Sequence, residues 1–162
     1  ALAVFMTSAG QAQNMKFGHI NSDDLIRALP EFDTANANLE KFRQELINAL
    51  ELMQVELNNK SDIFTKESKN YTDIVRQTKE QELIDMNRRI QEFQVNAQEQ
   101  LQNKQIELFQ PIYTKVDKAI KDVGKENGFL YVIDIAKGSL LYYDEAKSTN
   151  VLALAKTKLG LK

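Results

Sequence analysis

The chain has 162 residues, 43% of them hydrophobic and 27% charged. This length suits one domain with room for an extended appendage, and the composition excludes a disordered chain and a membrane-embedded bundle. The 21 basic and 23 acidic side chains give a formal charge of -2, which argues against a nucleic-acid-binding protein because such proteins need a basic face. With no cysteine in the sequence, a disulfide framework and thiolate chemistry are excluded.

The N-terminal residues are first apolar and then small. Residues 2–6 form an apolar run, and residues 7–12 are mostly small, with Gly10 and Ala12 matching a signal-peptidase cleavage pattern. We therefore expect residues 1–12 to be the tail of a truncated signal peptide and the mature protein to be secreted. A frayed apolar terminus of a cytosolic protein is the alternative. No later stretch approaches the roughly 20 apolar residues of a membrane-spanning helix.

A short strand and a short helix are expected next. Residues 15–21 alternate apolar and polar side chains, which predicts a strand. Asn21 or Ser22 can cap the helix that follows, and two aspartates in its first turn suit the helix dipole. Pro30 is expected to interrupt this helix.

Two long series of apolar residues with gaps of three and four dominate the middle of the chain. Such spacing keeps one narrow seam facing a partner helix. It predicts an antiparallel helical hairpin, or arm, over 31–110, with its bend within 66–80 and a length of roughly 60 Å. Pro111 is expected to kink or divide the second helix. The first series is Phe32, Ala35, Leu39, Phe42, Leu46, Leu50, Met53 and Leu57, and the second begins Leu83, Met86, Ile90, Phe93, Ala97 and Leu101.

The C-terminal part is expected to be globular. Asn127-Gly128 predicts a helix end, 129–135 a buried strand, and 140–143 its antiparallel hairpin partner after a turn at Lys137-Gly138. A polar loop over 144–150 and a final helix ended by Gly160 follow.

The fold class is thus α+β and predominantly helical, with a β-rich body over 13–30 and 111–162. A sheet of one hairpin and one strand is too small to be stable alone, so we expect other subunits to complete it. The candidate residues of this oligomer-forming body are Phe17, Ile20, Phe129, Tyr131, Ile133, Leu140 and Tyr142.

The sequence contains no catalytic constellation, so we expect no enzymatic activity, cofactor or metal. His19 is the single histidine, which leaves no triad or histidine cluster, and a structural role is the simpler interpretation. Asp23 and Asp24 are explained by capping, and no nucleophile accompanies Asp134 or Asp144.

Several apolar residues near the predicted bend break the spacing of the seam. They either complete the bend or offer weak apolar contacts to an unfolded chain, which makes them the candidate client-binding residues: Ile63, Phe64, Tyr71, Ile74 and Val75. The aromatic residues Phe129, Tyr131, Tyr142 and Tyr143 are expected to pack in the core or at a subunit interface, with a ligand-stacking platform as the alternative.

The order of these elements resembles the OmpH/Skp family of periplasmic chaperones for outer-membrane proteins. The resemblance covers the chain from about Gln13 onward, and its body segments are more specific than its coiled-coil-like arm. Three stretches carry it: Phe17-Gly18-His19-Ile20-Asn21 with Leu29-Pro30-Glu31-Phe32, Pro111-Ile112-Tyr113 with Ala119-Ile120 and Gly128-Phe129, and Tyr131-Val132-Ile133-Asp134 with Leu140-Leu141-Tyr142-Tyr143-Asp144.

The resemblance implies a homotrimer whose arms enclose a cavity and hold unfolded outer-membrane proteins in the periplasm without ATP. Many weak contacts on several arms raise effective concentration without a tight contact anywhere. This chain departs from the strongly basic family members, which disfavours electrostatic capture and binding to lipopolysaccharide or membrane surfaces. A second departure is Ser148-Thr149-Asn150-Val151 before the last helix, where the family often has Asp-Ile-Thr. The alternative function is a coiled-coil adaptor or structural protein of the cell envelope, while a cytosolic prefoldin-like chaperone is disfavoured by the predicted signal peptide.

Overall fold

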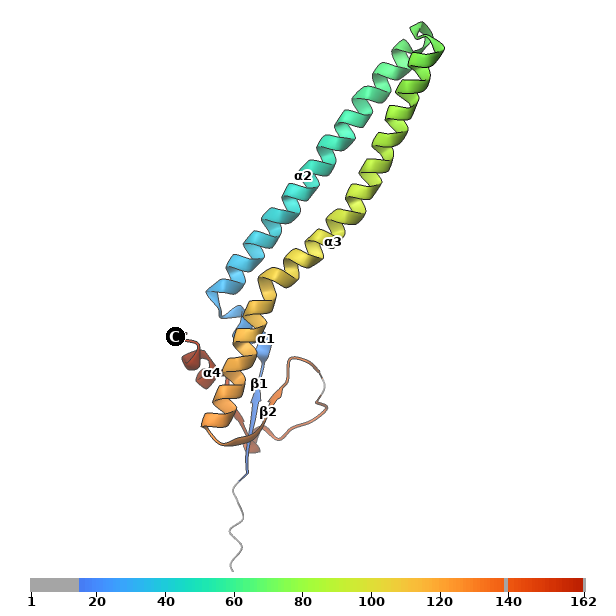
Figure 1. The fold of residues 1–162 in the computed structure, drawn as a ribbon. Helices are drawn as coiled ribbons and strands as arrows, with labels where there is room; N and C mark the ends of the chain where they lie inside the picture. Colours follow the sequence, from blue (N-terminus) through green and yellow to red (C-terminus); the bar gives the residue numbers. More distant parts are fainter. Residues whose placement is uncertain (1–14, 139, 162) are drawn as a thin grey trace, which may run out of the picture. The chain divides into compact units, whose positions relative to one another are not determined.

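The computed structural model describes residues 15–138 and 140–161, and the predicted signal-peptide tail lies outside them. The described chain is predominantly helical (Figure 1). It divides into two compact units, which we call the arm (Pro30–Ile112) and the body (15–29 with 113–161). The elements are β1 (Lys16–Ile20), α1 (Ser22–Arg27), α2 (Pro30–Glu67), η1 (Ser68–Asn70), α3 (Asp73–Glu126), β2 (Phe129–Asp134), η2 (Glu145–Lys147), β3 (Ser148–Asn150) and α4 (Leu152–Lys158).

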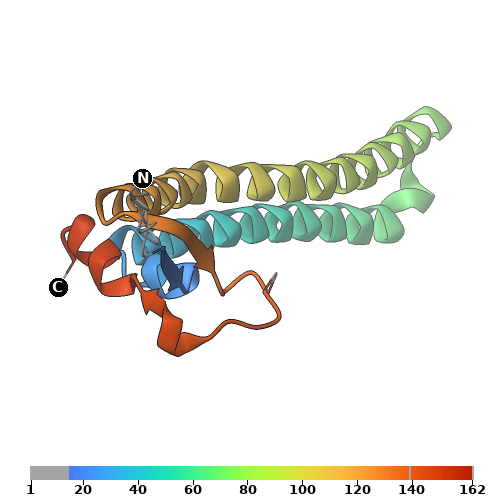
Figure 2. The same cartoon turned by 90° about the horizontal axis from the view of Figure 1, so that it is seen from below.

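The arm is the predicted antiparallel helical hairpin. Its two helices, α2 and the first part of α3, run side by side in both views (Figures 1 and 2). α2 has 38 residues, which corresponds to about 57 Å at 1.5 Å per residue. The bend consists of η1 and the residues after it, where the backbone N–H of Tyr71 donates to the carbonyl of Ser68 at 3.3 Å. The bend therefore lies within the predicted interval 66–80.

The predicted seam forms the interior of the arm. Every residue of the first series, and every residue of the second from Leu83 to Leu101, is buried or half-buried. In the outer half of the arm, Leu57, Met86 and Ile90 form a buried cluster flanked by Leu50, Met53 and Leu83. At the end of the arm opposite the bend, the rings of Phe32 and Phe109 meet edge to face with centroids 5.6 Å apart. The heptad-like spacing is confirmed as the packing rule of this unit.

Pro111 does not divide the second helix. α3 runs without interruption from Asp73 to Glu126 with Pro111 inside it. Proline removes one backbone donor, but Phe109 and Ile112 on either side of it are buried, and this packing offsets the lost hydrogen bond. Of the two predicted alternatives, division of the helix is therefore wrong.

The body contains a three-stranded sheet of order β2-β1-β3, and both pairings are parallel. In the register, Gly18 lies opposite Val132 of β2 and Thr149 of β3. Parallel neighbours need a long crossover connection, and the whole of the arm and α3 provides it between β1 and β2. The short N-terminal strand is thereby the central strand of the sheet.

The predicted β-hairpin after β2 is wrong. Residues 140–143 form no strand, and Leu141 and Tyr142 are exposed. The third strand comes instead from 148–150, within the segment predicted as a polar loop, and it pairs with the opposite edge of β1. The chain leaves β2 at Asp134, whose carboxylate accepts a hydrogen bond from the N–H of Ala136 at 3.1 Å and turns the backbone away.

The core of the body is small but closed. Its buried apolar residues come from β1, α1 and the segment after it, the end of α3, and α4 with the residue before it. They are Ile20, Leu25, Leu29, Val116, Ala119, Val123, Val151 and Ala155. Gly128, at φ 68°, ends α3 as predicted. The amide oxygen of Asn150 accepts from the N–H of Leu152 at 2.9 Å and begins α4, which Gly160 terminates.

Candidate functional site

The tip of the arm gathers the predicted client-binding residues at the bend (green in Figure 1). Ile63 and Ile74 are 51% and 74% exposed, and Val75 is also exposed. Phe64 and Tyr71 are half-buried, with ring centroids 6.3 Å apart and planes tilted by 47°. The bend thus accounts for the burial of Phe64 and Tyr71 and leaves the three aliphatic side chains in solvent.

Tyr71 is fixed at both ends of its side chain. Its ring lies against Phe64, and its hydroxyl donates to Glu67 Oε2 at 3.0 Å. That hydrogen bond, with smaller effects of burial and of the Glu67 charge, raises the pKa of Tyr71 above its ordinary value. The hydrogen bond to Glu67 and the contact with Phe64 together hold the ring at the bend.

A cavity of about 370 Å³ opens between the helices at the tip. It brings together three of the five predicted residues, Ile63, Phe64 and Tyr71. Ile74 lines a separate depression with Gln77 and Gln81, and Val75 belongs to neither lining. The lining residues of the cavity are Lys60, Ile63, Phe64, Tyr71, Lys79, Glu82 and Leu83. Sequence reasoning missed Lys60, Lys79, Glu82 and the role of Leu83. Lys60 precedes Phe64 by about one turn of α2, whereas only the register of the two helices brings the other three residues, from α3, to the same cavity.

The predicted oligomer-forming residues occupy different environments in the body. Ile20 is fully buried in the chain's own core. Phe17 and Tyr131 stack across β1 and β2 with centroids 6.2 Å apart, and both remain exposed. Tyr142 is exposed on the loop after β2, while the remaining three are half-buried: Phe129, Ile133 and Leu140.

His19 lies on β1, almost completely buried. Its Nδ1 lies 2.9 Å from the hydroxyl oxygen of Ser148 on β3, and the ring of Tyr143 packs against it with centroids 4.8 Å apart. Both contacts tie the segment after β2 to the central strand. This environment is that of a structural histidine.

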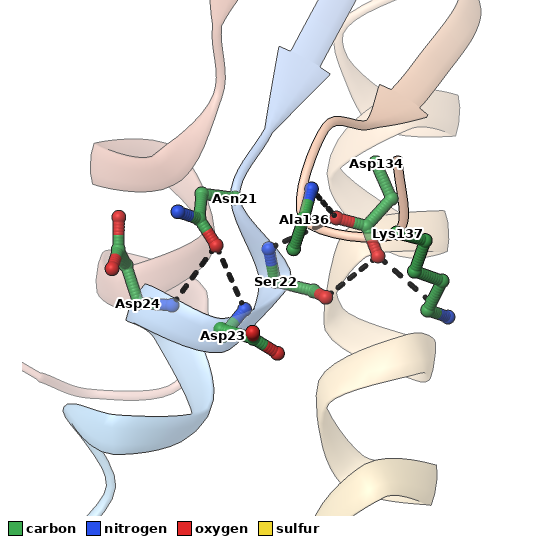
Figure 3. Close-up of polar contacts among 7 residues, drawn as sticks. All are labelled: Asn21, Ser22, Asp23, Asp24, Asp134, Ala136 and Lys137. Carbon is green, nitrogen blue, oxygen red and sulfur yellow. Dashed lines mark hydrogen bonds and ion pairs between the residues drawn. The ribbon is translucent and has the colours of Figure 1, made fainter. Parts of the chain in front are cut away.

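Asp134, at the end of β2, accepts hydrogen bonds from two residues and pairs with a third (Figure 3). Its carboxylate accepts from the N–H and hydroxyl of Ser22 at 3.1 and 2.6 Å, and Lys137 Nζ lies 3.6 Å away. Burial raises the pKa of Asp134, but the hydrogen bonds from Ser22 and Ala136 and the charge of Lys137 outweigh it, so the pKa is held below its usual value.

This network joins the first turn of α1 to the end of β2. Asn21 caps α1 from the other side, since its amide oxygen accepts from the N–H groups of Asp23 and Asp24 at 3.1 and 3.4 Å (Figure 3). The hydrogen bonds of Asn21, Ser22 and Asp134 cap α1 and terminate β2, so we interpret the cluster as a structural junction.

The described residues form neither a metal-binding cluster nor a membrane-spanning helix. Across 15–138 and 140–161, no group of three or more histidine and carboxylate side chains is placed to hold a metal ion. Among the helices described, none combines the length and apolarity that crossing a bilayer requires.

The fold of this chain matches that of a protein of known structure. A crystal structure of a candidate outer membrane chaperone (OmpH-like) from Caulobacter crescentus CB15 superposes with a TM-score of 0.75 at 12% identity, covering 97% of this chain and 90% of that one. This likeness shows the same fold. No curated protein matches the chain. The family model described as "Outer membrane protein (OmpH-like)" matches residues 16–159, which include the arm and all three strands. The chain therefore belongs to the OmpH-like family of outer membrane proteins.

Proposed function

We propose that this protein is an ATP-independent holdase of the periplasm that binds unfolded outer-membrane proteins and prevents their aggregation. The observation that carries the proposal is the arm, a two-helix hairpin that leaves large apolar side chains in solvent at its tip. Membership of the OmpH-like family and the likeness to the Caulobacter crescentus structure support it. No enzymatic step and no cofactor belong to this function.

The proposed contacts are weak and numerous. Ile63, Ile74 and Val75 offer exposed aliphatic surface, and Phe64 and Tyr71 offer partly exposed rings. Each such side chain contributes little, because fully burying a large apolar side chain stabilises by only about 1.5–3 kcal/mol. Several arms on one oligomer would raise the effective concentration of such sites, so that a client is held while each contact stays reversible.

We further propose that the body forms a homotrimer through its exposed aromatic surface. Phe17, Tyr131 and Tyr142 are large side chains left in solvent. β2 and β3 are the outer strands of a three-stranded sheet, so each has an edge open to further pairing. Contact with other copies of the chain would bury the exposed aromatic side chains and pair the open strand edges at the same time.

The experiment is native mass spectrometry of residues 13–162, alone and with a urea-unfolded outer-membrane barrel protein. We expect three copies alone and three copies plus one client in the mixture. Replacing Phe64, Tyr71 and Ile74 together by Ser should weaken client retention and leave the oligomer mass unchanged. A monomer or dimer that ignores the client contradicts the proposal.

One observation supports the adaptor as a second candidate function. Ile84, Val95 and Ile106 on α3 are all more than half exposed and recur every eleven residues. That period keeps side chains on one helical stripe, as in right-handed helix pairs. Exchanging Ile84 and Val95 for Ser should abolish binding of a helical partner in the adaptor case, and should leave retention of an unfolded barrel protein unchanged in the holdase case.

A further inference from the structure

The cavity at the arm tip is a more specific feature than the scattered apolar side chains around it. We infer that it binds one aromatic side chain of an extended client segment, with an acidic residue beside that aromatic. The inference rests on the proposed holdase function, because the extended segment would belong to an unfolded client protein. It differs from that function in assigning a defined pocket and a preferred sequence to the client.

The size of the cavity fits one bulky side chain. Its volume is about 370 Å³, at the small end of ligand pockets, which span roughly 300–1,000 Å³. Leu83 and Ile63 provide aliphatic walls, and Phe64 and Tyr71 provide aromatic ones. A single bulky side chain that projects from an extended chain can enter such a space.

The walls of the cavity favour an aromatic occupant. The Phe64 and Tyr71 rings are tilted by 47°, so an inserted ring can meet one of them edge to face or offset, which adds about 0.5–1.5 kcal/mol beyond its area burial. Glu67 holds Tyr71 in this orientation through its hydroxyl. The site is therefore organised before the client arrives, which lowers the entropy lost on binding.

The charge around the cavity favours an acidic neighbour on the client. In the arm as a whole, acidic side chains outnumber basic ones by fifteen to ten. Between residues 60 and 79 the balance is reversed, with Lys60, Lys66, Lys69, Arg76 and Lys79 against Asp62, Glu67 and Asp73. The cavity lining itself carries Lys60 and Lys79 against Glu82, so a client carboxylate meets a local excess of positive charge there and an excess of negative charge along most of the arm.

Two lysines of the lining can supply this attraction. Lys60 Nζ lies 3.0 Å from Glu56 and Lys79 Nζ lies 3.0 Å from Glu82, each within one helix. Exposed pairs of this kind contribute only about 0.2–1 kcal/mol, so either ammonium group can turn toward an incoming carboxylate at little cost. Unfolded barrel proteins carry aromatic girdle residues, which makes such aromatic segments available in the proposed clients.

The test uses tryptophan as a probe, because the protein has none of its own. Flexible Gly/Ser peptides with a central Asp-Trp-Asp or Lys-Trp-Lys are titrated with the full chain, and the blue shift of Trp emission reports burial. We expect Asp-Trp-Asp to bind about tenfold more tightly than Lys-Trp-Lys, a difference of about 1.4 kcal/mol. Phe64→Leu should weaken Asp-Trp-Asp binding by a similar factor.

Variants of the cavity rim and a control complete the design. The double exchange Lys60→Gln with Lys79→Gln should bring the two peptides to within about twofold of each other, since it removes the charge preference. Leu52→Ser is the matched control, because Leu52 is 72% exposed on α2 and absent from the lining, and it should change neither affinity. Equal affinities for the two peptides, or Asp-Trp-Asp binding unaffected by Phe64→Leu, overturn the inference.

Failure of the inference can be told apart from failure of the proposed function. A chain that suppresses aggregation of an unfolded barrel protein but shows no peptide preference is a holdase without the pocket specificity. A chain that shows the peptide preference but fails to suppress aggregation has the pocket without the holdase function. Circular dichroism shows whether Phe64→Leu keeps its helicity. If helicity is lost, the inference is tested by the Lys60→Gln with Lys79→Gln variant and by the affinities of the two peptides for the unaltered chain.

Discussion

The arm and the body are stabilised by different kinds of contact. In the arm, seam residues from two helices bury one another, and the buried apolar residues, Ala35, Leu57, Met86, Ile90, Phe109 and Ile112, each keep a few per cent of their surface exposed. In the body, a short strand is paired with segments more than 110 residues further along the chain. The arm thus depends on a repeated local pattern, whereas the body depends on a few long-range contacts that form together or fail together.

This difference predicts that single substitutions act globally in the body and locally in the arm. Leu25 of α1 is fully buried, so Leu25→Ala should cost about 3–4 kcal/mol from the lost side chain and the cavity it leaves. Hydrogen exchange should then show β1, β2 and β3 losing protection together. Strands that exchange independently of one another would contradict a single cooperative body.

Met86→Ala tests the same idea in the arm. Met86 lies in the buried cluster with Leu57 and Ile90, and its truncation should cost about 2–3 kcal/mol. Increased hydrogen exchange should be confined to the neighbouring turns of α2 and α3, with the body protected as before. Spread of the effect to the strands would show that the two units unfold as one.

Asp134→Asn should cost about 2 kcal/mol at neutral pH, because two hydrogen bonds from Ser22 to a charged acceptor are weakened. The pKa of Asp134 is lowered in the folded chain, so its contribution is fully present above the unfolded-state pKa of about 3.9. It is lost as the pH falls through the lower folded-state value. Urea unfolding should therefore show the gap between Asp134→Asn and the unaltered chain closing in acid, and a gap that persists there contradicts the network.

Gly128→Ala gives the smallest expected effect of the four. Gly128 has φ 68°, where a Cβ atom is strained, and nothing lies within 4 Å of that Cβ position. The cost should be about 1 kcal/mol from backbone strain alone. Thermal unfolding checks this, and Gly128→Asn should cost less because asparagine tolerates this conformation better.

The candidate site was partly predictable from the sequence. Ile63, Phe64 and Tyr71 were identified because they break the seam spacing, and the cavity contains all three. Lys60 and Lys79 were not identified, because each is an ordinary surface lysine within its own helix. Their position on one cavity follows from the antiparallel register of α2 and α3, which no local pattern specifies.

Local sequence patterns are sufficient to predict the arm, the cap of α1 and the end of α3. Heptad-like spacing, Asn21 and Gly128 act through neighbours within a few residues, so their effect can be read locally. β1 and β2 lie within the predicted strands 15–21 and 129–135, whereas the strand order and the third strand depend on tertiary contacts. The apolar run 140–143 was predicted as a strand and the polar run 148–150 as a loop, yet β3 is Ser148–Asn150. Backbone pairing with β1 and the contact of Ser148 with His19 hold that strand, and backbone hydrogen bonds across such distances leave no periodic signature in the side chains.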